Sequence, residues 1–416
     1  STWSSVGGGV MTDSVSLSTG SCLSAVGTVH SLLATFDSSG PALYVGGDFI
    51  SAGGIPADMV ARWNGVSWTG SPSQTCVRNP LVPMRVDALA SYDDGSGPGV
   101  YAGGIFGAIG GVAARSVARF NGVSWEPLAE GVARISPAGA VWWGLISSMA
   151  VFDSGEGAEL VVGGVSDRAG IDPGLAKGVA RWNGESWAPL GGGLDSTFTS
   201  MEEASGVQAL AVFDDGSGPA LFASGAFRNE TASTFNGIAK WDGTAWLPLG
   251  EGLSDPGTGG MAMALFEDRL VVGGSFNLAG GAVTHGTARW GPEGWSTFGS
   301  DLSGQVSAMA LYDDGTGPAL YAAGTFASAG STLLNRIGRW SGTEWEPLGS
   351  GFDGSVNALA VFDDGSGPTL YAGGSFSGSG SLPLAGIARW DGSNWTGVGG
   401  GVMSGPDAGR VEALHV

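Results

Sequence analysis

The sequence predicts an all-β protein built from one repeated unit of four short strands, and two observations support this. First, an aromatic residue, nearly always Trp, is followed five residues later by a second Trp across a tight polar turn. This spacing recurs seven times, at Trp63/Trp68, Phe120/Trp125, Trp182/Trp187, Trp241/Trp246, Trp290/Trp295, Trp340/Trp345 and Trp390/Trp395. Second, two apolar runs precede each pair. Four strands in a period of roughly 50 to 60 residues are typical of a β-propeller, in which one unit forms one blade.

The best-preserved unit predicts each strand in turn. Residues 356–362 are apolar on both faces, as expected for a first strand that lines the central channel between two neighbouring blades. The turn 363–368 contains Asp, Gly and Pro, which suit a tight hairpin into the second strand. The third strand, Ile387 to Trp390, turns through residues 391–394 into the fourth strand at Trp395.

Paired glycines recur in the predicted second strand. They occur at Gly46-Gly47, Gly103-Gly104, Gly163-Gly164, Gly273-Gly274 and Gly373-Gly374. Such a pair weakens an isolated strand, so its recurrence indicates close approach by a bulky group. We expect the repeat tryptophans to be that group.

Complete units predict a single β-propeller spanning residues 1–416, with seven four-stranded blades. The expected blades cover residues 29–69, 86–126, 145–188, 207–247, 261–296, 306–346 and 356–396. Segments 1–11 and 397–416 are expected to close the ring, because residues 3–11 copy the end of a unit and residues 411–416 restart a first strand. The alternative is eight blades, one of them incomplete.

Composition excludes several functional classes. The formal net charge is −21, the only lysines are Lys177 and Lys240, and arginines are spread along the chain, so nucleic acid is not an expected partner. No apolar run is long enough to span a bilayer, and the repeat pattern begins at Ser1 with no targeting segment before it. His30, His285 and His415 are scattered over the repeat, so we expect neither a metal site nor a cofactor.

The two cysteines, Cys22 and Cys76, lie in loops of adjacent predicted blades. We expect a disulfide between them, which would contribute about 4 kcal/mol in the chain-entropy model. The alternative is two unpaired thiols. A bridge implies an oxidising compartment, and therefore a secreted or cell-surface protein.

Candidate site residues lie in the long connections that precede the first strands of blades one to four, residues 7–28, 70–85, 128–144 and 191–206, and near them. Long loops on a rigid scaffold often carry function. Trp142 and Trp143 are expected at the mouth of the channel, where they either stack on a ligand or plug the mouth. The other candidate ligand-binding residues are Arg78, Arg134, Phe198 and Arg228. Asp195, Glu202 and Glu203 are either an acid–base set or solvated loop charges.

A cation precedes the aromatic residue of every third strand. These cations are Arg62, Arg119, Arg181, Lys240, Arg289, Arg339 and Arg389. We expect them to pair with acidic residues of the first turn in each blade, namely Asp94, Asp215, Asp314 and Asp364. Calcium binding by these turns is disfavoured, because they lack the spaced oxygen ligands of a calcium loop.

The chain resembles the kelch and galactose-oxidase-type propellers over nearly its whole length. The shared features are the double glycine after an apolar strand and an aromatic residue followed a few residues later by Trp. It is also similar to repeats of secreted bacterial proteins of unassigned role and of fungal cell-cortex polarity markers, through Tyr371–Phe376 and Ala388–Gly392. Two departures from kelch are the first Trp, where kelch favours Tyr, and the Asp-Asp-Gly-Ser-Gly-Pro turn.

The favoured function is an extracellular or cell-surface binding and assembly propeller that recognises a glycan or protein through the loops of blades one to four. No catalytic residue is expected in that case. Self-association through terminal strands is a further expected partner interaction. The alternative is a glycan-active hydrolase or lyase that uses the loop carboxylates named above.

Overall fold

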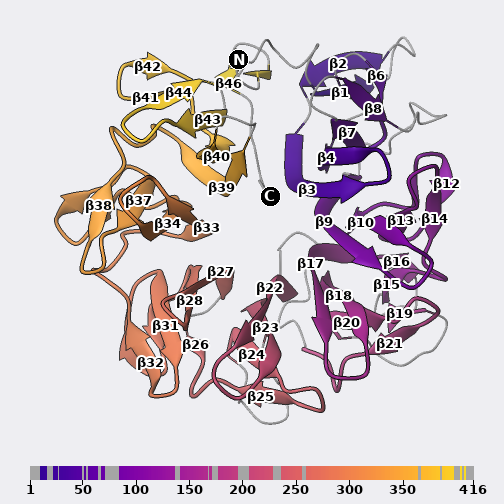
Figure 1. Ribbon diagram of the computed structural model, residues 1–416, viewed down its shortest axis with the longest axis horizontal. Coiled ribbons are helices and arrows are strands. Elements are labelled where there is room, and N and C mark those ends of the chain that lie inside the picture. Colours follow the sequence, from indigo (N-terminus) through magenta and orange to yellow (C-terminus); the bar gives the residue numbers. More distant parts are fainter. Residues whose placement is uncertain are drawn as a thin grey trace.

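The computed structural model describes residues 10–15, 22–26, 28–48, 51–52, 55–63, 67–70, 84–135, 141–166, 168–170, 177–194, 206–227, 236–254, 259–363, 367–384, 387–397, 403–404 and 407–408. Every regular element in these ranges is a β-strand, and seven four-stranded blades stand around a central axis (Figure 1). The predicted all-β propeller of seven four-stranded blades is confirmed, and the described ranges contain no eighth blade.

Each blade has four antiparallel strands, called A to D from the axis outward (Figure 1). Blade one comprises β3 (Thr28–Asp37), β4 (Gly40–Asp48), β7 (Val60–Trp63) and β8 (Trp68–Gly70). Blade two comprises β9 (Arg85–Asp93), β10 (Pro98–Ile105), β13 (Val117–Phe120) and β14 (Trp125–Pro127). Blade three comprises β17 (Leu145–Asp153), β18 (Ala158–Val165), β20 (Val179–Trp182) and β21 (Trp187–Pro189). Blade four comprises β22 (Gly206–Asp214), β23 (Pro219–Ala226), β24 (Ile238–Trp241) and β25 (Trp246–Pro248).

The remaining three blades follow the same order. Blade five comprises β27 (Gly260–Phe266), β28 (Arg269–Gly274), β31 (Thr287–Gly291) and β32 (Gly294–Thr297). Blade six comprises β33 (Val306–Asp313), β34 (Pro318–Gly324), β37 (Ile337–Trp340) and β38 (Trp345–Pro347). Blade seven comprises β39 (Ser355–Asp363), β40 (Pro368–Ser375), β43 (Ile387–Trp390) and β44 (Trp395–Gly397).

The connections before strand A and those between strands B and C meet on one face, called here the loop face. β15 (Val132–Ile135) pairs with β19 (Arg168–Ala169), and β26 (Leu253–Ser254) pairs with β29 (Leu278–Ala279). Both kinds of connection therefore emerge on the same face. The other short strands are β1 (Val10–Val15), β2 (Cys22–Val26), β5 (Ser51–Ala52), β6 (Ile55–Pro56), β11 (Ala108–Ile109), β12 (Val112–Ala113), β16 (Val141–Trp143), β30 (Ala282–Val283), β35 (Ser328–Ala329), β36 (Thr332–Leu333), β41 (Gly378–Ser379), β42 (Leu382–Pro383), β45 (Met403–Ser404) and β46 (Asp407–Ala408). The opposite face, called the turn face, carries the A to B and C to D turns.

The paired glycines of strand B are packed closely against two neighbours, neither of which is a tryptophan. The first glycine faces strand A of the next blade: a Cβ on Gly163 would lie 2.6 Å from Val207 Cγ1. The second glycine faces its own strand A, which bulges opposite the pair, so that a Cβ on Gly164 would strike the carbonyl oxygen of Leu145. The expectation that the repeat tryptophans press on these glycines is therefore wrong.

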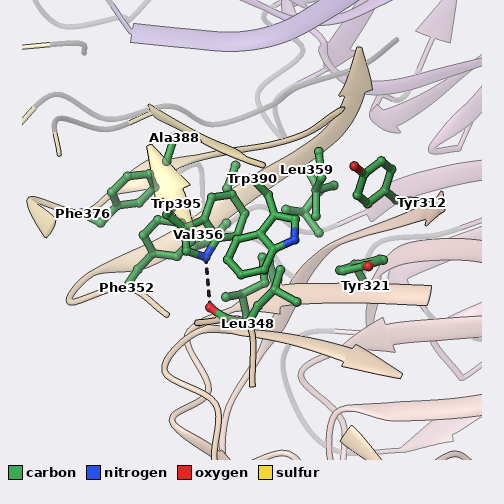
Figure 2. Packing of buried hydrophobic residues seen from close by; sticks show 14 of the residues in the cluster. Tyr312, Tyr321, Leu348, Phe352, Val356, Leu359, Phe376, Ala388, Trp390 and Trp395 are labelled. Carbon is green, nitrogen blue, oxygen red and sulfur yellow. Dashed lines mark hydrogen bonds between the residues drawn. The ribbon is translucent and has the colours of Figure 1, made fainter. Parts of the chain in front are cut away.

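The tryptophans instead join each blade to the one before it. In blade seven, Trp390 and Trp395 face each other across strands C and D with ring centroids 5.2 Å apart (Figure 2). Trp395 Nε1 donates to the backbone oxygen of Leu348 in blade six at 3.1 Å. The same bond to the preceding blade is made by Trp187, Trp246 and Trp295. Burying each indole stabilises the folded propeller by roughly 2 to 3 kcal/mol.

The strand C cations of blades two, four and six pair with acidic residues of the first turn, as predicted. Lys240 Nζ lies 2.6 Å from Asp215 Oδ2, and Arg339 Nε lies 3.3 Å from Asp314 Oδ2. Arg119 is 3.6 Å from Asp94, whereas Arg181 in blade three pairs with Glu159, and Asp364 lies outside the described residues. In blades two, four and six the cation therefore holds the first turn of its own blade, whereas Arg289 of blade five donates a hydrogen bond to Ser296 of strand D.

In blade one the same ion pair joins Arg62 and Asp37. Two bonds link them, from Nε to Oδ2 at 2.5 Å and from Nη2 to Oδ1 at 2.8 Å. The Tyr44 hydroxyl donates to the same carboxylate at 2.8 Å. The hydrogen bonds from Arg62 lower the pKa of Asp37, and burial raises the pKa of Tyr44. Asp37 is therefore ionised and fully engaged at neutral pH.

Candidate binding surfaces

The first candidate surface is a three-stranded sheet on the loop face, with strand order β16, β15, β19. β15 and β16 form a hairpin in which Ala133 opposes Trp143 and Arg134 opposes Trp142. Val132 and Ala133 are buried, so the base of the hairpin belongs to the core. The sheet brings together three of the predicted ligand-binding residues, Trp142, Trp143 and Arg134.

Hydrogen bonds to blade two anchor the base of this hairpin. Val132 N donates to Arg115 O at 3.1 Å, and Ser116 Oγ donates to Gly144 O at 2.9 Å. The Trp143 ring lies over Gly107, where an added Cβ would be 2.7 Å from ring atoms. Trp143 is therefore half-buried and serves mainly to fix the hairpin on blade two.

The tip of the hairpin is apolar and exposed. Trp142 is 47% exposed and Val141 is 49% exposed, and Ile135 opposite Val141 is also exposed. Arg134 lies across from Trp142, at the cross-strand distance at which side chains interact. Within the described part of the chain β16 is an edge strand, so its outer backbone groups face no other strand. An indole between aliphatic and cationic neighbours on a free edge is suited to binding rather than to covalent chemistry.

The remaining predicted site residues lie outside the residues that the structure describes. These are Arg78, Phe198, Arg228, Asp195, Glu202, Glu203 and Cys76. Cys22 begins β2, but the position of its side chain is not described. Their roles and the disulfide stay predictions.

The second candidate surface is a cleft on the turn face between blades one and two, and the sequence analysis missed it. Two adjoining cavities of about 340 and 370 Å³ share the lining residues Asp37, Ser38, Tyr44, Phe120 and Gly122. One signal was available: Phe120 occupies the only strand C aromatic position in the seven repeats that is not Trp.

A third cluster lies between the inner strands of blades one and two. Asp87 Oδ1 is 2.7 Å from Arg85 Nε and 3.6 Å from His30 Nδ1. His30 and Asp87 are the bulged residues of their strands, one blade apart. The sequence analysis treated His30 as one of three scattered histidines and did not single out Asp87. In the described ranges, this cluster included, no group of three or more His, Cys, Asp or Glu side chains could hold a metal ion.

No protein-family model matches the chain, and no curated protein matches it. One similar solved structure is BBS1N in complex with ARL6DN, with a TM-score of 0.46, 13% identity, and 88% of this chain and 94% of that chain covered. Another is the GH74 xyloglucanase from Xanthomonas campestris, with a TM-score of 0.25, 13% identity, and 99% and 74% covered.

A third similar structure is the extracellular domain of a hybrid two component system from B. thetaiotaomicron. Its TM-score is 0.26, at 11% identity, and the alignment covers 92% of this chain and 48% of that chain. This chain thus spans about half the length of that protein. The resemblance to kelch-type repeats stays a prediction. In the described ranges the structure contains no helix suited to crossing a membrane.

Proposed function

We propose that this protein is an extracellular binding propeller that recognises a protein partner through the loop face of blades two and three. The observation that carries the proposal is the exposed Trp142 at the tip of an edge hairpin anchored in two blades. Trp and Arg are the residue types that dominate binding energy at protein interfaces. Exposed Ile135 and Val141 beside Trp142 favour a protein ligand over a glycan, because aliphatic groups add no hydrogen bonds to sugar hydroxyls.

The edge position of β16 supports an extended partner segment. A free strand edge offers backbone N–H and C=O groups to an added strand, while alternate side chains contact the sheet surface. In this geometry the partner's backbone pairs with β16, and its side chains cover Trp142. Secretion is supported by the two cysteines in the sequence, which would pair in an oxidising compartment.

A displayed peptide library tests this proposal. Peptides are selected on the wild-type protein and their affinities are measured against Trp142→Ala by calorimetry. We expect about a tenfold or greater loss of affinity, which corresponds to about 1.4 kcal/mol. Val283→Ser, at another exposed aliphatic residue on the loop face, is the matched control and should bind normally.

Polysaccharides are assayed in parallel for binding and for cleavage. Selected peptides that bind Trp142→Ala as tightly as wild type would refute the role of the hairpin. Saturable glycan binding that depends on Trp142 would replace the protein ligand with a glycan. Cleavage of a polysaccharide would favour the hydrolase or lyase alternative.

A further inference from the structure

The cleft between blades one and two occupies space that aromatic side chains fill at the corresponding position elsewhere. In each strand A, an aromatic residue stands five positions after the bulged residue in blades two to seven, namely Tyr92, Phe152, Phe213, Phe266, Tyr312 and Phe362. Blade one carries Thr35 at this position. Its hydroxyl bonds to Ser91 of blade two at 3.3 Å, which leaves the space of a ring unfilled.

The seam between blades six and seven shows how this space is normally occupied. Tyr312 packs 5.7 Å from Tyr321 and donates its hydroxyl to Pro368 O of blade seven. Trp390 lies in the same buried cluster (Figure 2). Two large rings, one from each blade, therefore close this seam.

Between blades one and two, both of these positions carry a smaller side chain. Thr35 replaces the first ring and Phe120 replaces the second, the indole. Phe120 stands 6.3 Å from Tyr44 at a tilt of 59° and is only partly buried. Glycines at positions 97, 99 and 122 also line the cleft. The cleft is thus a direct product of small side chains at two repeat positions.

At the rim of the cleft, two exposed apolar side chains stand at positions that carry polar residues in most of the other blades. Phe36 is 78% exposed at a position that is acidic in the other six blades. Val123 is 90% exposed at a position that carries Glu185, Thr244, Glu293, Thr343 and Ser393 in blades three to seven. Exposed apolar side chains that gather at one opening mark a site of interaction.

We propose that this cleft is a binding site for a planar aromatic ring, either a free small molecule or the aromatic side chain of a peptide. Tyr44 and Phe120 supply ring faces and edges, and Phe36 and Val123 supply apolar contacts at the opening. Arg62 and the hydroxyls of the Ser38–Ser39 turn supply polar groups that orient a ring substituent, while Asp37 holds Arg62 in place. The volume is that of a small ligand pocket.

Ligand-observed fluorine NMR tests the site directly. The probes are fluoroindole, a Gly-Trp-Gly peptide with a fluorinated Trp, and a fluorinated cyclohexane of similar volume. We expect saturable binding of the first two probes and little binding of the cyclohexane. Tighter binding of the tripeptide than of fluoroindole assigns the site to a peptide side chain, and the reverse order assigns it to a free aromatic compound.

Restoring the repeat residues should close the cleft. In Phe120→Trp and Thr35→Phe we expect binding of both aromatic probes to be lost, while the circular dichroism spectrum is unchanged. Binding to these variants that equals wild type, absence of binding to the wild type, or equal binding of the cyclohexane would each overturn the proposal. Phe36→Ser is expected to weaken binding without changing the fold, because Phe36 is almost wholly exposed.

The reverse exchange should create the site elsewhere. Tyr312→Thr combined with Trp390→Phe introduces the side chains of the first seam, Thr and Phe, into the seam between blades six and seven. We expect a second binding site for fluoroindole, seen as a doubled stoichiometry. If the double variant unfolds, Trp390→Phe alone is compared with wild type. A folded double variant with unchanged stoichiometry would contradict the assignment of the cleft to the missing rings.

Discussion

The seam between blades six and seven and the seam between blades one and two use the same strand positions with different results. In the first, Tyr312 and Trp390 fill the outer half of the seam and Trp395 bonds back to Leu348. In the second, Thr35 and Phe120 leave a cleft in that half. The inner halves differ as well: a Cβ on Gly46 would lie 2.7 Å from Val86 Cγ1 of blade two, whereas blade six carries Ala323 at the corresponding position. A propeller can therefore give up packing at one outer seam without losing the ring.

The largest expected effect is the removal of the buried indole. Trp390→Ala should lower the free energy of unfolding by about 3 to 5 kcal/mol, since it leaves a cavity in a fully packed seam. Phe120→Ala should cost only about 1.5 kcal/mol, because its ring is already partly exposed. Urea unfolding, monitored by circular dichroism, measures the free energy of unfolding of both variants. Equal losses of this free energy would show that the two seams are packed alike.

The next effect tests whether strand B glycines are packed as tightly between blades one and two as between blades three and four. Gly163→Ala and Gly46→Ala should each cost about 1 to 3 kcal/mol, because the new Cβ would lie 2.6 Å from Val207 Cγ1 or 2.7 Å from Val86 Cγ1. Gly192→Ala, where nothing lies within 4 Å, is the control and should be neutral. If Gly46→Ala is tolerated while Gly163→Ala is destabilising, the loose packing between blades one and two also includes the contact between Gly46 and Val86.

Filling the cleft should stabilise the protein modestly. Phe120→Trp restores the repeat residue and is expected to add about 1 kcal/mol to the free energy of unfolding. Differential scanning calorimetry would show this as a higher Tm. A lower Tm would mean that the cleft lacks the shape of the other seams.

The smallest effect concerns pH at the cleft wall. The pKa of Asp37 is lowered from its ordinary value of 3.8, so its stabilising contribution is complete above that value and is lost as pH falls through the lowered one. Asp37→Asn should therefore cost about 1 kcal/mol at neutral pH and progressively less below about pH 4. The Tm values of the wild type and of Asp37→Asn are compared between pH 7 and pH 2.5. A difference in Tm that stays constant over this range would mean that the interaction with Arg62 does not depend on the charge of Asp37.

Much of the fold was predictable because its signals are local and repeated. The paired aromatic residues predicted strands C and D, and the cation before them predicted the ion pairs to the first turn. The reason for the paired glycines was not predictable, since it depends on a bulge in a strand some sixteen residues earlier and on a valine in the next blade. Sequence periodicity reports neither contact.

The candidate sites show the same limit. Trp142 and Arg134 were found because they stand outside the repeat, and the structure describes both on one hairpin. The cleft was missed because Phe120 still fits an aromatic pattern and Thr35 still fits a strand. What distinguishes them is lost volume, which becomes evident only when two blades are placed face to face.

The hydrogen bonds that four strand D indoles make to the preceding blade share one direction along the chain. Trp187, Trp246, Trp295 and Trp395 all donate to a carbonyl that lies 46 to 59 residues nearer the N-terminus. On a translating ribosome, the acceptor for each of these bonds therefore emerges before its donor. Each newly made blade can dock at once on a surface that is already in place, so assembly of the ring can proceed in the order of synthesis.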